Sequence, residues 1–172
     1  MPENIEINPA THITISAVGE PGNRTFYLQG SQGKDLISLV IEKSQAAMIA
    51  EAIEGLIADV MADHPDLAGS DKTESLSVDL RLRDPEIVMF RVGNLGLGFS
   101  EETKRIIIVA YELVSEGLEP SVVSFWGSFD QMRGLVEHTR QIVKSGRPVC
   151  GNCGESMDQS GHFCPRRNGH NH

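Results

Sequence analysis

The chain has 172 residues, of which 40% are hydrophobic and 23% are charged, a balance typical of a globular protein rather than a disordered one. Its net charge of −9 is uneven: residues 1–146 carry −10, from 12 basic and 22 acidic residues, and residues 147–172 carry +1, from 3 and 2. The acidic residues 1–146 would repel the phosphate backbone of a nucleic acid, which argues against general nucleic-acid binding. The chain lacks the run of about 18 apolar residues that spans a bilayer and the pattern of a signal peptide. We therefore expect a cytoplasmic protein with no membrane association.

Three strands are predicted first, because polar and apolar side chains alternate in short runs between glycine- and proline-rich turns. They cover residues 11–18, 24–29 and 36–41. An amphipathic helix follows, in which apolar residues recur at steps of three and four from Ile49 to Met61. This helix is predicted to end at His64, because the residue before a proline avoids helical geometry.

A second group of strands precedes a second helix. Residues 76–82 alternate again, as an edge strand or an extended linker would. The three clearer strands are predicted at residues 87–99, 106–111 and 122–126. The second amphipathic helix begins at Ser128, where Gln131 completes a capping box, and it stops before Gly146 and Pro148.

The two helices are similar to each other in sequence. A shift of 86 positions aligns Gln45 with Gln131 and Ile49 with Leu135, and each helix follows an apolar strand. We therefore predict one α+β domain over residues 1–146. In it, two ββα-like halves form an antiparallel sheet, with the two amphipathic helices packed on one face.

The last stretch of the chain contains all three cysteines and predicts a small zinc-ribbon-like module over residues 147–172. Two cysteines with a two-residue spacer can direct both thiolates at one ion, and the third follows a polar turn beside a histidine. Four protein ligands suit a tetrahedral structural Zn²⁺ site, whereas a catalytic site keeps a position for water. The predicted ligands are Cys150, Cys153, His162 and Cys164. His170 is the reserve for the fourth position.

Other roles for these cysteines fit the sequence less well. A redox Cys-x-x-Cys pair usually opens a helix, which Pro148 and Gly154 disfavour here. A disulfide framework is disfavoured by the odd number of cysteines and by the absence of a secretory signal.

Two segments resemble a known family. The first is Val-Gly-Glu-Pro-Gly-Asn-Arg-Thr-Phe-Tyr-Leu-Gln at residues 18–29. The second combines Gly-Arg-Pro-x-Cys-x-x-Cys-Gly with Gly-His-x-Cys-Pro-Arg-x-Asn-Gly within residues 146–169. Together they are similar to the uncharacterised bacterial domain-of-unknown-function family 3090, and the resemblance covers nearly the whole chain. It implies an intracellular protein with a zinc-ribbon-like end, and it brings no established catalytic residue or substrate. Val149 and Gly151 stand where that family often has proline, and neither side chain is a ligand.

The function expected from the sequence is non-enzymatic binding of another protein, although an enzyme stays open. No cluster of nucleophile, base and orienting group can be identified, and the Cys/His set is used by a closed metal site. The zinc module would serve as a structural staple or as a contact surface. Its rim would suit an acidic partner through Arg147, Arg166 and Arg167.

Two alternatives belong to other functional classes. The first is an enzyme or small-ligand sensor whose site lies between the sheet and the zinc module and uses residues such as Arg24, Arg91 or His138. The second is a local nucleic-acid contact through the weakly basic ribbon.

Overall fold

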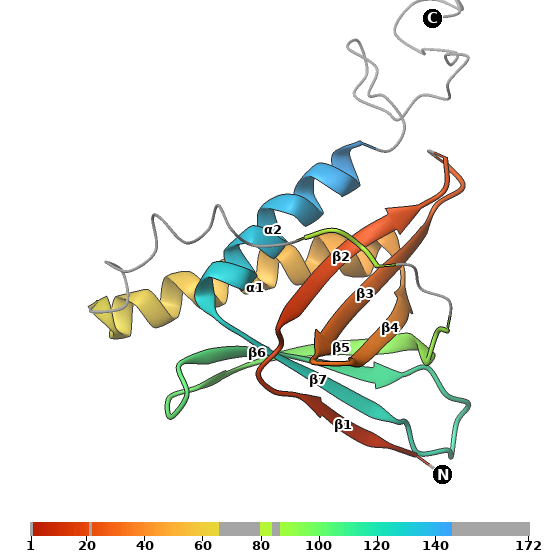
Figure 1. Ribbon diagram of the computed structural model, residues 1–172, viewed down its shortest axis with the longest axis horizontal. Coiled ribbons are helices and arrows are strands. Elements are labelled where there is room, and N and C mark those ends of the chain that lie inside the picture. The colour runs from red at the N-terminus through yellow and green to blue at the C-terminus, as the bar shows by residue number, and fades with distance from the viewer. Residues whose placement is uncertain (1, 21, 66–79, 84–86, 146–172) are drawn as a thin grey trace, which may run out of the picture.

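The computed structural model describes residues 2–20, 22–65, 80–83 and 87–145. These residues form an α+β fold, a seven-stranded mixed sheet with two helices (Figure 1). The strands are β1 (Asn4–Ile7), β2 (His12–Val18), β3 (Thr25–Gln32), β4 (Asp35–Ile41), β5 (Phe90–Ser100), β6 (Arg105–Glu112) and β7 (Val122–Gly127). The helices are α1 (Lys43–Asp63) and α2 (Phe129–Lys144). Neither described helix combines the length and apolar content that a membrane span needs.

The sheet has the strand order β1-β7-β6-β5-β4-β3-β2 and is not wholly antiparallel, so that part of the prediction is wrong. β4 pairs with β5 in parallel, with Leu39 opposite Phe90, and β1 pairs with β7 in parallel. Parallel neighbours need a crossover connection, and α1 lies in the one that joins β4 to β5. The other described pairs are antiparallel.

Two units of three strands and a helix make up most of the described chain. The first unit is β2-β3-β4-α1 and the second unit is β5-β6-β7-α2, so each predicted ββα-like half contains one more strand than expected. The two helices cross on the same side of the sheet (Figure 1). Their inward rows join one hydrophobic core with both groups of strands.

The starts of the two helices are built alike. Gln45 and Gln131 each accept a hydrogen bond through Oε1 from the backbone N–H of the N-cap residue, at 2.7 and 2.8 Å. Their side-chain nitrogens reach outside their own unit, since Gln45 donates to the carbonyl of Val92 in β5 and Gln131 donates to the carbonyl of Ala10, just before β2. The two glutamines that the 86-position shift aligns therefore occupy equivalent places.

The sheet bends until its two ends meet in the chain between β1 and β2. These strands stand at opposite ends of the strand order, yet only residues 8–11 separate them. Within that link the N–H of Ala10 donates to the carbonyl of Trp126 in β7, and the N–H of Thr11 donates to the carbonyl of Ser31 in β3, both at 2.8 Å. β1 was not predicted, because its polar–apolar alternation extends over only four residues.

Inside the bend, an aromatic ring of the second unit lies against a glycine of the first. Phe125 of β7 is fully buried, and a Cβ atom placed on Gly30 of β3 would lie 2.4 Å from its ring carbon Cδ1. No side chain at position 30 fits without moving the ring. The absence of a side chain at Gly30 thus lets the two units pack closely.

Candidate functional site

The predicted zinc site cannot be located in this structure. Its ligands Cys150, Cys153, His162 and Cys164, and the reserve His170, lie outside the described residues. Within the described ranges, no group of three or more His, Cys, Asp or Glu side chains could hold a metal ion. The zinc hypothesis therefore rests on residue types and spacing alone.

Arg24, a residue of the enzyme alternative, closes the C-terminus of α2. Its Nη1 donates to the carbonyl of Ile142 at 3.0 Å and to Oγ of Ser145 at 3.4 Å. Its guanidinium lies 4.9 Å from the ring centroid of Phe26. A cation there satisfies a carbonyl of the last helical turn and complements the helix dipole. A structural role accounts for this arginine.

The other two residues of that alternative lie at different places. Arg91 of β5 pairs with Glu42 at 2.8 Å, just before α1, with both side chains largely exposed. His138 lies on α2, where its Nε2 is buried and has no hydrogen-bond partner among the described residues. Desolvation lowers the pKa of His138, which favours a neutral ring at pH 7. Each of the three residues thus has its own environment.

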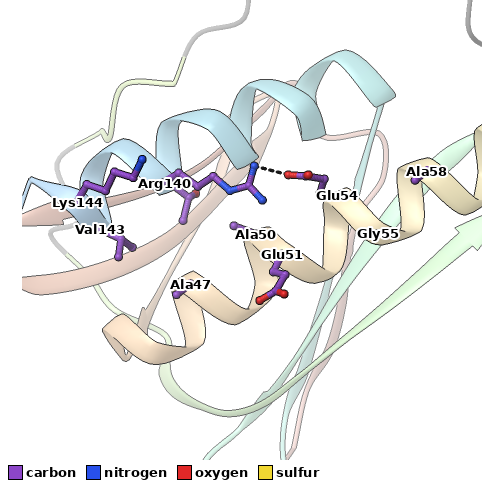
Figure 2. Close-up of a pocket in the computed structure, with 10 residues that line it drawn as sticks. Ala47, Ala50, Glu51, Glu54, Gly55, Ala58, Arg140, Val143 and Lys144 are labelled. Atoms are coloured by element: carbon purple, nitrogen blue, oxygen red, sulfur yellow. Dashed lines mark ion pairs between the residues drawn. The ribbon is translucent and has the colours of Figure 1, made fainter. Parts of the chain in front are cut away.

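An open groove of about 760 Å³ lies between α1 and α2 (Figure 2). On the α1 side its lining is mainly small, from Ala47, Ala50, Gly55 and Ala58. A Cβ atom on Gly55 would meet no atom within 4 Å, so packing in the described chain does not require this glycine. Alanine favours helix without filling space, which explains how α1 forms a regular helix and still leaves a hollow beside it.

The two sides of the groove differ in charge. α1 contributes Glu51 and Glu54, and α2 contributes Arg140 and Lys144. Glu54 and Arg140 form an ion pair across the groove (Figure 2), although both side chains are about half exposed. A pair so exposed to water adds little to stability, so its charges remain available to a ligand.

The ion pair also lies where an approximate twofold axis relates the two helices. The shift of 86 positions that aligns the helices aligns Glu54 with Arg140. Equivalent positions that contact each other lie on a twofold axis, here an approximate one. A second hollow, of about 450 Å³, lies on the other side of this pair and shares Glu54, Arg140 and Lys144 with the groove.

The second hollow is the approximate counterpart of the groove. Its lining includes Arg133 and Lys144, which the same shift aligns with Ala47 and Ala58 of the groove. The second hollow, which has the long side chains, is therefore smaller than the groove, which has alanines at the aligned positions. Neither hollow was predicted from the sequence; the small residues Ala47, Gly55 and Ala58, which are exposed on α1, are the signal that could have indicated the groove.

The floor of the groove contains a polar group without a partner. Thr139 is fully buried, and its Oγ1 has no hydrogen-bond partner among the described residues. The aligned residue of α1 is Ile53, also fully buried. A hydroxyl thus stands where the other unit has a methyl-rich side chain.

One comparison with known proteins gives a match. A family model described as "Protein of unknown function (DUF3090)" matches residues 6–164. The matched range includes Cys150, Cys153, His162 and Cys164, and it ends before His170. Neither a curated protein nor a solved structure matches the chain.

Proposed function

The chain belongs to the family of proteins of unknown function DUF3090, and we propose that it is a non-enzymatic, cytoplasmic zinc protein that binds a helix of another protein. The groove between α1 and α2 is the observation that supports this proposal. It is open, it has small side chains along one helix, and its two sides carry opposite charges.

The small side chains of α1 suit a helical partner. Ala47, Gly55 and Ala58 are exposed, and together they span about three turns of α1. The distance between packed helices depends on the side chains at the contact, so small residues allow a third helix to approach closely. The second hollow beyond the ion pair extends the surface available to that helix.

The charges indicate which helix would fit. A partner with basic residues along one edge would face Glu51 and Glu54, and acidic residues along its other edge would face Arg140 and Lys144. Complementary edges select the direction of the bound helix as well as its identity. The ion pair between Glu54 and Arg140 would open, and each charge would pair with the partner instead.

The zinc module is proposed to act next to the groove. Lys144 lines the groove, and the module is predicted to begin at residue 147. Zinc would supply most of the folding free energy of so short a segment. Arg147, Arg166 and Arg167 would then offer a basic contact surface to the same partner.

Zinc binding is tested by metal analysis of the purified full chain. We expect about one zinc per chain, lost in Cys153→Ser because one of four ligands is removed. His162→Ala should also lose the metal, whereas His170→Ala should keep it. Equal zinc in the parent and in Cys153→Ser would refute the site, and the opposite result for the two histidines would exchange the fourth ligand.

The groove is tested by site-specific photo-crosslinking in the full chain. Ala58→p-benzoylphenylalanine places the reactive group in the groove, and the same change at Ala52 provides the control, because Ala52 is exposed on α1 but does not line the groove. We expect a protein crosslink from position 58, mapped to a helix with one basic and one acidic edge, and none from position 52.

A pair of matched substitutions then measures the contribution of the groove to binding. Gly55→Leu adds a bulky side chain to the groove at a position where a Cβ atom meets nothing within 4 Å, and it should weaken binding of the crosslinked partner about tenfold or more. Ala52→Leu should leave that affinity unchanged. Unchanged affinity in Gly55→Leu, or a crosslink that maps to an extended acidic segment, would contradict the helix-binding proposal.

A further inference from the structure

Five polar side chains of the first unit are buried on the sheet face opposite the helices. They are at most 3% exposed and comprise His12, Thr14, Gln29, Ser31 and Ser38. Their neighbours Ile13 and Leu28 belong to the core, and side chains alternate between the two faces of a strand, so the five share the outer face. The register places them in two rows: Thr14, Gln29 and Ser38 lie side by side, and His12 lies opposite Ser31.

A short extended segment, residues 80–83, covers these rows, and we call it the strap. It is the yellow-green segment beside β2 in Figure 1. Oγ1 of Thr14 donates to the carbonyl of Leu80 at 2.7 Å, and Nε2 of His12 donates to the carbonyl of Arg81 at 2.8 Å. The predicted edge strand or linker at residues 76–82 is thus extended at residues 80–82, and residues 76–79 lie outside the described chain.

Gln29 makes the most complete contact with the strap. Its Nε2 donates to the carbonyl of Arg83 at 2.7 Å, and its Oε1 accepts from the N–H of the same residue at 2.8 Å. The amide thus binds both main-chain groups of Arg83, as a neighbouring β-strand would. Nε2 of Gln29 also donates to Oγ of Ser38, which holds the amide in this orientation.

These contacts recognise the main chain of the strap. All four bonds that Thr14, His12 and Gln29 make to it end on carbonyl oxygens or an N–H. Main-chain recognition gives affinity for extended peptides of many sequences, as in strand-addition complexes. Arg83 adds a side-chain contact, from Nη1 to Oγ of Ser31 at 3.1 Å.

The strap leaves one buried nitrogen of His12 unused. Nε2 of His12 donates to the carbonyl of Arg81, because a carbonyl only accepts. The other ring nitrogen, Nδ1, is buried and has no partner among the described residues. The strap therefore does not satisfy every buried polar group of this face.

The route of the chain also points to a purpose for the strap. α1 already lies in the crossover between the parallel strands β4 and β5, yet residues 64–89 separate α1 from β5. Of the described residues in this connection, 80–83 lie on the opposite face of the sheet. Connections longer than roughly 12–15 residues are uncommon in compact domains and are usually either functional segments or linkers. The contacts of residues 80–83 with the sheet favour a functional segment here.

We propose that the outer face of β2–β4 is a binding site for an extended peptide of another protein, and that the strap occupies this site until the peptide displaces it. The peptide resembles the strap, with alternating apolar and basic residues and a free N–H at the position of Arg83. The site is separate from the helix groove and does not depend on the function proposed for it.

Displacement must overcome the strap's connection to the same chain. A tethered segment acts at a high effective concentration, so a free peptide binds well only when the strap is weakened. Arg83→Pro weakens it by removing the N–H that Gln29 accepts, and leaves the row of polar side chains intact.

The test uses a fluorescent synthetic peptide of residues 76–87 of this chain and measures its binding to the full-length protein by anisotropy. We expect Arg83→Pro to bind the peptide about tenfold or more tighter than the wild type does. Adding Thr14→Val and Gln29→Leu to that variant should abolish the gain. Adding Thr11→Val should keep it, because the hydroxyl of Thr11 bonds to the carbonyl of Ser31 and not to the strap.

Equal binding by the wild type and a folded Arg83→Pro protein would overturn the proposal, as would binding that survives the loss of Thr14 and Gln29. If one of these variants fails to fold, hydrogen exchange on the wild type decides the question. Excess peptide should accelerate exchange of the Arg83 amide several-fold if it displaces the strap. No acceleration at a peptide concentration at which anisotropy detects binding to the wild type would refute displacement.

Discussion

The two units of the sheet have the same order of elements, but their outer faces differ in character, although Ser124 is a buried polar residue on the outer face of the second unit. The first unit buries polar side chains there, beneath the strap. On the corresponding face, the second unit carries Ile107, Val109 and Trp126, which are half-buried, and Tyr111, which is 38% exposed. Strand alternation decides which residues share a face, but what covers that face depends on the rest of the chain. One topology therefore supports two different surfaces.

The helices differ in a similar way. α1 places alanines and a glycine beside the groove, and α2 places Arg133 and Lys144 at the positions aligned with Ala47 and Ala58. The buried rows of both helices are apolar except for Thr139 of α2, so most of the difference lies on the sides that face away from the sheet. The approximate repeat is thus kept in the core and lost at the surfaces that are free to bind.

The largest expected difference in stability is between two glycine substitutions. Gly30 lies on the inner face of the first unit, and Gly96 lies on the outer face of the second unit. Gly30→Ala should destabilise the fold by about 3 kcal/mol, because the new Cβ meets the Phe125 ring. Gly96→Ala should change stability by less than about 0.5 kcal/mol, because a Cβ there has no atom within 4 Å. Urea denaturation of both variants measures the difference. Similar losses at the two positions would contradict the close packing of the units at Gly30.

An intermediate loss of stability is expected when the buried polar row of the first unit is disrupted at Gln29. Gln29→Leu should cost about 1–3 kcal/mol, because it leaves both main-chain groups of Arg83 without their partner. In the second unit, Ser124→Ala removes one hydrogen bond, from Nε1 of Trp126, and should cost about 0.5–1.5 kcal/mol. The same denaturation experiment ranks the two. If Gln29→Leu costs no more than Ser124→Ala, the strap contributes little to the stability of the first unit.

The smallest effect concerns pH and the two helices. Burial lowers the pKa of His138 below its ordinary value of 6.5, so the folded state binds fewer protons there than the unfolded state. The resulting stability is complete above about pH 6.5 and is lost as the pH falls through the lowered pKa. His138→Ala, which copies the aligned Ala52 of α1, should reduce this loss when urea midpoints at about pH 7.5 and about pH 5 are compared.

Ala52→His provides the control for that comparison. Ala52 is exposed, so a histidine there has no burial to shift its titration and should add no pH dependence to stability. An unchanged slope in His138→Ala would show that burial of this ring does not govern the acid sensitivity of the fold.

Local sequence patterns were sufficient to place most elements. Alternation located the strands, and the three-and-four spacing located both helices, because each pattern records which side chains leave water. The helix ends followed from backbone chemistry close in the chain. Ser128 is the N-cap of α2 with Gln131 completing the capping box, and His64 before Pro65 is the C-cap of α1. Kinship with the family, over residues 6–164, was also readable from two short motifs.

Only the tertiary structure decided how these elements combine. The parallel pairing of β4 with β5 and of β1 with β7 depends on where connections run, which periodicity does not encode. Gln29 and Arg83 are 54 positions apart, and their contact exists only because the strap crosses the outer face of the sheet. The groove required the crossing of α1 and α2, which brings Glu54 to Arg140. Sequence alone determines which residues can be buried, whereas the path of the chain determines which of them meet.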